Sequence, residues 1–124
     1  MTVHQQISKA VMAHGAWKSQ LHDAIARGAS DANVTNVRLD NQCEFGKWMY
    51  GKDLSDQDKR SPLYAQCRTL HRQFHLAAAK VLNLALAAKK EEALRAMAVP
   101  DGEFAISSSA LTKAMMDWDR EVPH

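Results

Sequence analysis

Apolar residues recur every three or four positions through most of this 124-residue chain, and that period is typical of helices. The clearest stretches lie at residues 3–27, 61–87, 89–99 and 103–121. No segment shows the two-residue alternation of a half-buried strand. Turn and cap residues separate the stretches at Gly28, at Ser61-Pro62 and around Pro100. The sequence therefore predicts an all-α fold, an antiparallel four-helix bundle formed by a single domain over residues 1–124.

A short additional helix is expected between the first two long ones. Residues 28–40 are small and polar, which predicts a loop. Asp40 could cap a short helix that carries Cys43 and ends near Gly51. The residues expected to pack this helix against the bundle are Phe45, Trp48 and Met49. The charged residues 52–60 predict a solvated loop.

Charge and hydropathy exclude several classes of partner. The net charge of +2 is small and evenly spread, which argues against nucleic acid. No apolar stretch reaches the roughly 20 residues that span a membrane, and the first residues lack the pattern of a signal peptide. We therefore expect a cytoplasmic protein with no nucleic-acid or membrane partner. In a reducing compartment Cys43 and Cys67 are better suited to metal binding or redox chemistry than to a structural disulfide.

Three histidines occupy positions that predict inward-facing side chains. His71 and His75 are four residues apart, so on a helix their β-carbons lie about 5–6 Å apart on one face. Alone, this pair is more typical of two partly exposed histidines that hydrogen-bond to their neighbours than of a metal site. His14 lies on the apolar stripe of the first helix, where a buried imidazole is costly unless its nitrogens have partners. A metal ion would satisfy all three. The histidines expected at the surface or at the mobile chain end are His4, His22 and His124.

Either cysteine could complete a metal site with these histidines. Cys67 lies four residues before His71 on the same helix face, and spacing does not choose between it and Cys43. Three imidazoles and one thiolate suit Zn(II), with bonds of about 2.0–2.1 Å to nitrogen and about 2.3 Å to sulfur. Di-iron bundles instead use several Glu and a Glu-x-x-His repeat, which this sequence lacks.

Four pieces of the sequence, in order, resemble the chemoreceptor zinc-binding domain, or CZB domain. They are AHGAWKSQL at 13–21, QCEFGKWMYG at 42–51, SPLY at 61–64 and LHRQFHLAAAKV at 70–81. The Cys-x-Phe-Gly-Lys-Trp signature is the most specific of them, and the resemblance extends over essentially the whole chain. It implies zinc ligands at His14, Cys43, His71 and His75. It also implies no ligand role for Cys67.

The resemblance further implies a regulatory domain rather than an enzyme. Members of the family usually sit at one end of bacterial chemoreceptors or diguanylate cyclases and regulate them in response to zinc or oxidants such as hypochlorous acid. They pair as homodimers, and apolar surface left by Met115, Met116 and Trp118 would mildly support this. The chain contains neither a cyclase domain nor a receptor coiled coil. It is therefore either a free-standing member or a domain of a longer protein, and its signalling partner is unknown.

Several roles for the zinc remain open at this point. Cys43 could act as a redox trigger, or the occupancy of the site could report free zinc. The zinc could also be purely structural and hold together an interaction module. A catalytic zinc, with Glu44 as the nearest candidate base, is expected least because such sites usually have three protein ligands and an open position.

Overall fold

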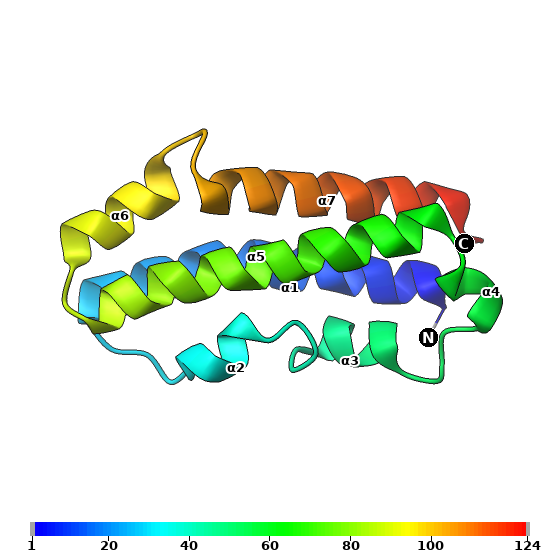
Figure 1. The fold of residues 1–124 in the computed structure, drawn as a ribbon, viewed down its shortest axis with the longest axis horizontal. Coiled ribbons are helices and arrows are strands. Elements are labelled where there is room, and N and C mark those ends of the chain that lie inside the picture. The colour runs from blue at the N-terminus through cyan, green and yellow to red at the C-terminus, as the bar shows by residue number, and fades with distance from the viewer. Residues whose placement is uncertain (1, 124) are drawn as a thin grey trace.

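The computed structural model describes residues 2–123, and its helices are joined by turns and loops, with no strand in that range (Figure 1). This confirms the all-α fold predicted from the apolar period. The helices in chain order are α1 (Val3–Arg27), α2 (Val34–Arg38), α3 (Glu44–Tyr50), α4 (Asp56–Lys59), α5 (Pro62–Leu86), α6 (Lys90–Ala98) and α7 (Glu103–Glu121).

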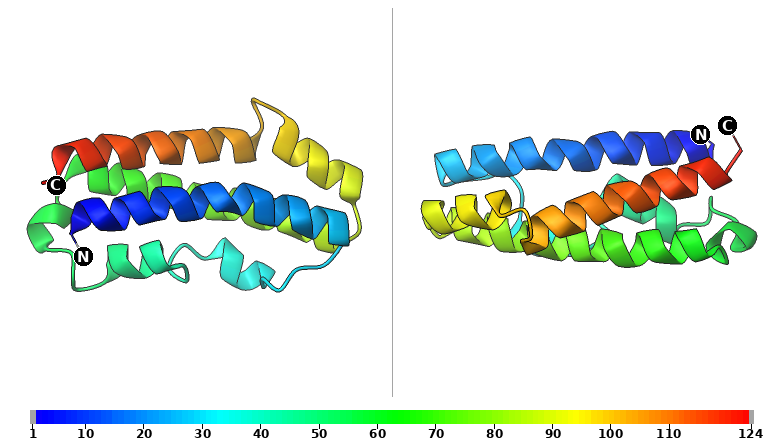
Figure 2. Two further views of the ribbon diagram at one scale, coloured as in Figure 1. Left: turned by 180° about the vertical axis from the view of Figure 1, so that it is seen from behind. Right: turned by 90° about the horizontal axis from the view of Figure 1, so that it is seen from above.

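The helices form a bundle of antiparallel legs (Figures 1 and 2). After α1 the chain returns along the molecule through α2 and α3, reverses again into α5, and returns a last time through α6 and α7. The short helices α2 and α3 thus form a leg of their own, while α6 and α7 share one. A helix rises about 1.5 Å per residue, so the 9-residue α6 is too short to lie along the whole 25-residue α5.

Local capping residues explain why the ends of the two longest helices match the sequence prediction. Thr2 forms a capping box with Gln5 at the start of α1, and Gly28 ends that helix with a left-handed φ of 66°. At the start of α5 the Ser61 side chain accepts a hydrogen bond from the backbone N–H of Leu63, and proline follows at the first helical position. These signals depend on neighbours in sequence, so they can be recognised without a tertiary structure.

The core lies between α1, α5 and α7. Its largest fully buried side chains include Leu21 on α1, Phe74 on α5 and Leu111 on α7. Met115 and Trp118 also pack inside, at 0% and 2% exposed, so the apolar surface expected from them near the end of the chain is absent. Of that trio, Met116 alone is exposed, at 54%. Pairing of two copies of the chain stays a prediction.

Two predictions about the segment between α1 and α5 are wrong in detail. The cap of α3 is Cys43 itself, whose sulfur accepts from the backbone N–H of Gly46, and not Asp40. Residues 52–60 are not a solvated loop throughout, because they include α4 and the buried side chain of Leu54, which is 2% exposed. A single apolar residue among charged ones carries no period, so its burial has no signal in the sequence.

Candidate metal centre

Four side chains that could bind a metal converge from three parts of the fold. His14 comes from α1, Cys43 stands directly before α3, and His71 and His75 come from α5. One donor atom of each lies within 4.8 Å of the other three. The imidazoles are buried, whereas Cys43 is partly exposed. The structure thus brings together the four residues selected from the sequence, while their role as ligands stays a prediction.

The distances within the cluster are those of a compact coordination sphere. Nε2 of His71 lies 3.0 Å from Nε2 of His14 and 3.0 Å from Nε2 of His75. The sulfur of Cys43 lies 3.3 Å from Nε2 of His71 and 4.0 Å from Nε2 of His14. A tetrahedron with metal–nitrogen bonds of about 2.0–2.1 Å has edges of roughly 3.3–3.4 Å. The widest separation in the cluster, up to 4.8 Å, would have to shorten by about an ångström for the four donors to surround one ion.

Backbone carbonyls orient two of the three imidazoles. Nδ1 of His14 lies 2.8 Å from the carbonyl oxygen of Ala10, and Nδ1 of His75 lies 2.8 Å from that of Val37. A carbonyl oxygen can only accept, so each Nδ1 carries the proton and donates it. Nε2 of both rings is then unprotonated, and its lone pair is directed into the cluster. Histidines that bind metals are commonly held by such a hydrogen bond from the other ring nitrogen.

His71 supplies the strongest sign that the cluster is built for a cation. Its Nε2 faces the Nε2 lone pairs of His14 and His75, and a single proton there cannot satisfy both neighbours at full strength. Its Nδ1 is buried with no hydrogen-bond partner in the described residues. Unpartnered buried polar atoms are costly. A cation bound among the Nε2 atoms would replace contact between lone pairs by attraction.

Burial keeps the three imidazoles neutral. Removal from water, with smaller contributions from the neighbouring rings, lowers the pKa of His14 to about 4 and that of His71 to about 2. It also lowers the pKa of His75. Burial raises the pKa of the Cys43 thiol, although the N–H of Gly46 partly opposes this. The imidazoles are thus ready as neutral ligands, whereas the thiol needs a cation to lose its proton.

Aromatic residues of α3 hold Cys43 against the histidines. The ring of Phe45 lies edge-on to His71 and His14, with centroids 5.2 Å and 5.9 Å away. Trp48 stacks at a tilt on Trp118 of α7, at 5.7 Å. This is the packing that the sequence predicted for the short helix.

Two further contacts hold the C-terminal end of α3. The hydroxyl of Tyr64 on α5 donates to the carbonyl oxygen of Met49 at 2.9 Å, and that of Tyr50 donates to the carboxylate of Asp40. Asp40 also passes close to Gly46, where an added Cβ would lie 1.8 Å from the Asp40 carbonyl oxygen. Glycine in the signature is therefore required by close approach of the backbone, and Asp40 has a role different from the predicted cap.

The second thiol does not belong to the cluster. Cys67 is fully buried, and it is not among the four residues whose donor atoms meet. Burial raises the pKa of Cys67 to about 12. Cys67 therefore packs as a small apolar residue in the core.

The remaining histidines lie outside the cluster too. His22 is exposed, as predicted. His4 is only half-exposed, because its Nδ1 lies 2.6 Å from the carboxylate of Asp119 and so connects the start of α1 with the end of α7. His124 lies outside the described residues. The contact of His4 had no signal in the sequence, since its partner is 115 residues away.

Backbone groups complete the site in a way that sequence reasoning missed. Ala10 lies four residues before His14, so helix geometry could have indicated that its carbonyl lies within reach of the ring. Val37 lies 38 residues from His75 and belongs to α2, which was expected to be part of a loop. A backbone carbonyl has no residue type, so no motif could have identified it.

A family model agrees with this geometry. The model of the chemoreceptor zinc-binding domain matches residues 14–82, which is more than half of the chain and contains all four clustered residues. The chain belongs to this family. The match is narrower than the whole-chain resemblance expected from the sequence. No curated protein and no solved structure matches the chain.

Family membership and donor chemistry together indicate zinc as the cofactor of this CZB domain. Three neutral imidazoles and one thiol, without a carboxylate, form a set that borderline-soft Zn(II) prefers.

None of the helices in residues 2–123 is long and apolar enough to cross a membrane.

Proposed function

We propose that this CZB domain is a regulatory module in which His14, Cys43, His71 and His75 hold Zn(II) and oxidation of Cys43 is the trigger. The observation that carries the proposal is the difference in exposure among the four. The three imidazoles are 7% exposed or less, whereas Cys43 is partly open to solvent and lines hollows at the surface. An oxidant arriving from solvent therefore reaches Cys43 more readily than the buried imidazoles.

The chemistry of the trigger follows from the state of the sulfur. A bound Zn(II) would keep Cys43 as a thiolate, which is the form that oxidants attack. Hypochlorous acid would convert that thiolate to a sulfenic acid and release chloride. A sulfenic acid is a poorer ligand, so Cys43 would lose its hold on the metal while His14, His71 and His75 kept theirs. The centre would change without unfolding α5.

The structural consequence falls on α3. This helix has seven residues, and Cys43 is its cap and its link to the metal. Apart from that link, aromatic packing and the hydrogen bond from Tyr64 to Met49 hold the helix, so loss of the sulfur removes one of its anchors. Release of the sulfur would therefore loosen α3 and the segment before it, and leave α1, α2, α5 and α7 packed. A partner that recognised α3 would detect the change.

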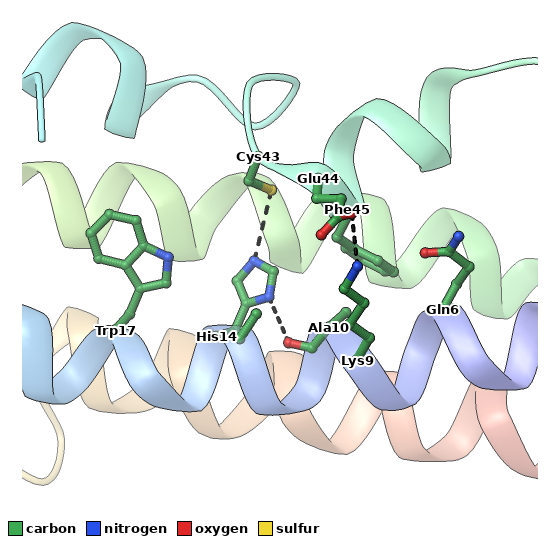
Figure 3. A pocket seen from close by; sticks show the side chains of 9 residues that line it. Gln6, Lys9, Ala10, His14, Trp17, Cys43, Glu44 and Phe45 are labelled. Carbon is green, nitrogen blue, oxygen red and sulfur yellow. Dashed lines mark hydrogen bonds and ion pairs between the residues drawn. The ribbon is translucent and has the colours of Figure 1, made fainter. Parts of the chain in front are cut away.

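Catalysis is the weaker alternative on two grounds. All four donors are protein side chains, so no position is left for substrate or water. The candidate base Glu44 is exposed and paired with Lys9 at 2.8 Å on the solvent side of the cluster (Figure 3). The Glu44 carboxylate is thus paired with Lys9 rather than with the imidazole nitrogens of the cluster.

The deciding experiment is an oxidant titration of the zinc-loaded protein. Hypochlorous acid is added up to one equivalent, released zinc is followed with a chromogenic chelator, and the mass of the Cys43 peptide is measured. We expect zinc release and oxidation of Cys43 to rise together in the wild type and in Cys67→Ala. If one equivalent leaves both the zinc and Cys43 unchanged, the redox proposal is wrong. Regulation by zinc occupancy would then be tested by changing free zinc alone.

A further inference from the structure

A sensor that is oxidised must also be reduced, and this chain has no second thiol in a position to do so. Cys67 is 0% exposed in the core and does not reach the cluster that contains Cys43. An internal disulfide would require α5 to unpack, because a disulfide needs Cα atoms within about 7 Å and suitably directed side chains. The reductant therefore comes from outside the chain.

Two hollows of different size meet at Cys43. The one shown in Figure 3 lies between α1 and α3, is lined in part by the ion-paired Lys9 and Glu44, and has a volume of about 50 Å³. One water needs roughly 10–15 Å³ on this scale, so the hollow has room for a few waters or a molecule such as hypochlorous acid. It is too small for a peptide-sized reductant.

The second hollow opens on the side of α2. Its volume is about 300 Å³, at the lower end of the roughly 300–1,000 Å³ that small-molecule sites occupy. Its lining residues include Trp17, the acidic Asp31, the amide residues Asn33, Asn36 and Gln42, and Cys43 itself. Amides donate and accept hydrogen bonds, and an indole face offers apolar contact. Such a lining suits a small peptide-like molecule.

We infer that the hollow beside α2, which we name the α2 groove, is the docking site of a low-molecular-weight thiol, of glutathione size or smaller, that reduces oxidised Cys43. This inference rests on the proposed redox role of Cys43 and adds the reaction that resets it. The thiol attacks the sulfenic sulfur, a sulfur–sulfur bond forms, and the hydroxyl leaves as water with the thiol proton. A second thiol attacks the mixed disulfide, restores the Cys43 thiol and leaves as the oxidised dimer of the reductant.

Most of the groove would survive the oxidation of Cys43. Trp17 belongs to α1, Asn33 and Asn36 belong to the start and interior of α2, and the buried His75 on α5 forms part of the floor. Gln42 and Cys43 alone come from the segment that the proposed trigger loosens. The groove is therefore present when the reductant is needed.

The test fills the groove and compares that variant with a matched one. Asn36→Trp places an indole in the groove, and the Asn36 side chain makes no contact that holds α2, since its cap bond uses the backbone N–H. Thr35→Trp adds the same bulk at the adjacent exposed position outside the groove. Ala13→Trp fills the smaller hollow instead. Circular dichroism and zinc content verify that all three fold as the wild type does.

Each protein is oxidised with one equivalent of hypochlorous acid, then given glutathione, and the mixed disulfide on Cys43 is followed by intact mass after acid quenching. We expect Asn36→Trp to react about tenfold more slowly than Thr35→Trp, which corresponds to about 1.4 kcal/mol of lost binding. Ala13→Trp should react like the wild type once oxidised. Equal rates for Asn36→Trp and Thr35→Trp would overturn the inference.

A second measurement tests whether the α2 groove binds glutathione, without the use of hypochlorous acid. The zinc is removed with a chelator, and the protein is mixed with oxidised glutathione, which exchanges directly with the Cys43 thiol. Asn36→Trp should again be slower than Thr35→Trp. If hypochlorous acid fails to oxidise Cys43 but this difference remains, the redox trigger is wrong while the groove still binds glutathione. Equal exchange rates for the two variants would refute the groove as a docking site, even if hypochlorous acid does oxidise Cys43.

Discussion

At the scale of single residues, the environment of each cysteine decides what its sulfur can do. Cys43 stands before a helix, partly exposed, with its sulfur 3.3 Å from an imidazole nitrogen. Cys67 is fully buried among apolar side chains. The two thiols are chemically identical in the unfolded chain, so the difference between them belongs to the folded state.

The first prediction concerns the zinc content of cysteine variants. Cys43→Ala removes one of four donors and leaves three imidazoles. We expect its zinc affinity to fall by more than the roughly 10–100-fold that loss of a residue supporting a ligand costs. Cys67→Ala removes a core sulfur and should keep about one zinc per folded chain. Plasma mass spectrometry of both purified variants checks this, and equal zinc in the two would show that Cys43 is not a ligand.

The second prediction concerns alkylation of the two thiols in the native protein. With a pKa of about 12, roughly one Cys67 in ten thousand is a thiolate at pH 8, and burial blocks the reagent as well. After chelation, iodoacetamide should therefore label Cys43 and leave Cys67 unmodified. Peptide mass mapping locates the label. Labelling of both in denaturant verifies that Cys67 reacts once exposed, and native labelling of Cys67 would contradict its place in the core.

At the scale of the elements, α3 depends on tertiary contacts for its existence. Isolated helices shorter than about 12–15 residues are marginal in water, and α3 has seven. It is held by the sulfur of its cap, by its aromatic contacts and by the close approach of its backbone to Asp40. Gly46 is the residue that permits this approach.

The third prediction compares two glycine substitutions. In Gly46→Ala the new Cβ would lie 1.8 Å from the Asp40 carbonyl oxygen, so the backbone of one segment must move. We expect a loss of about 1–3 kcal/mol in the free energy of unfolding, together with weaker zinc binding. Gly15→Ala, at an exposed helical position with no atom within 4 Å of the new Cβ, should gain about 0.5–1 kcal/mol. Urea unfolding of both variants measures this, and a neutral Gly46→Ala would refute the close approach.

At the scale of the whole molecule, the core and the centre are separate sources of stability. Most of the core lies between α1, α5 and α7 and is joined by Phe45 and Met49 of α3, whereas the cluster connects α1 and α5 to the segment before α3. Removal of zinc therefore takes away the stability contributed by the metal centre and leaves that contributed by the core. A purely structural zinc would instead be needed for the whole bundle.

The fourth prediction concerns chelation of the zinc-loaded protein. We expect far-ultraviolet circular dichroism to retain most of the helical signal, with hydrogen exchange rising chiefly in α3 and the segment before it. At a zinc concentration 100 times the dissociation constant, binding contributes about 2.7 kcal/mol, which is a rise in melting temperature of roughly 10 °C for a domain of this size. Cys43→Ala should show a smaller rise. Loss of all helical signal on chelation would favour the structural reading.

Much of the fold and the identity of the clustered residues were predictable, because both depend on patterns within short stretches of sequence. The three-to-four-residue apolar period and the caps at Thr2, Gly28 and Ser61 act between neighbours, so α1, α5 and α7 follow from local rules. The four candidate ligands could be named from their residue types, from helix spacing and from the CZB signature. Spacing by itself did not choose Cys43 over Cys67.

The tertiary structure alone decided how these pieces meet. It placed the Val37 carbonyl against His75, brought the Asp40 backbone to Gly46, paired α2 with α3 as one leg, and opened two unequal hollows beside Cys43. Each of these features joins residues that are distant in sequence or uses backbone atoms that every residue shares. A sequence specifies such contacts only through the packing of the whole chain, and for that reason they carry no local signal.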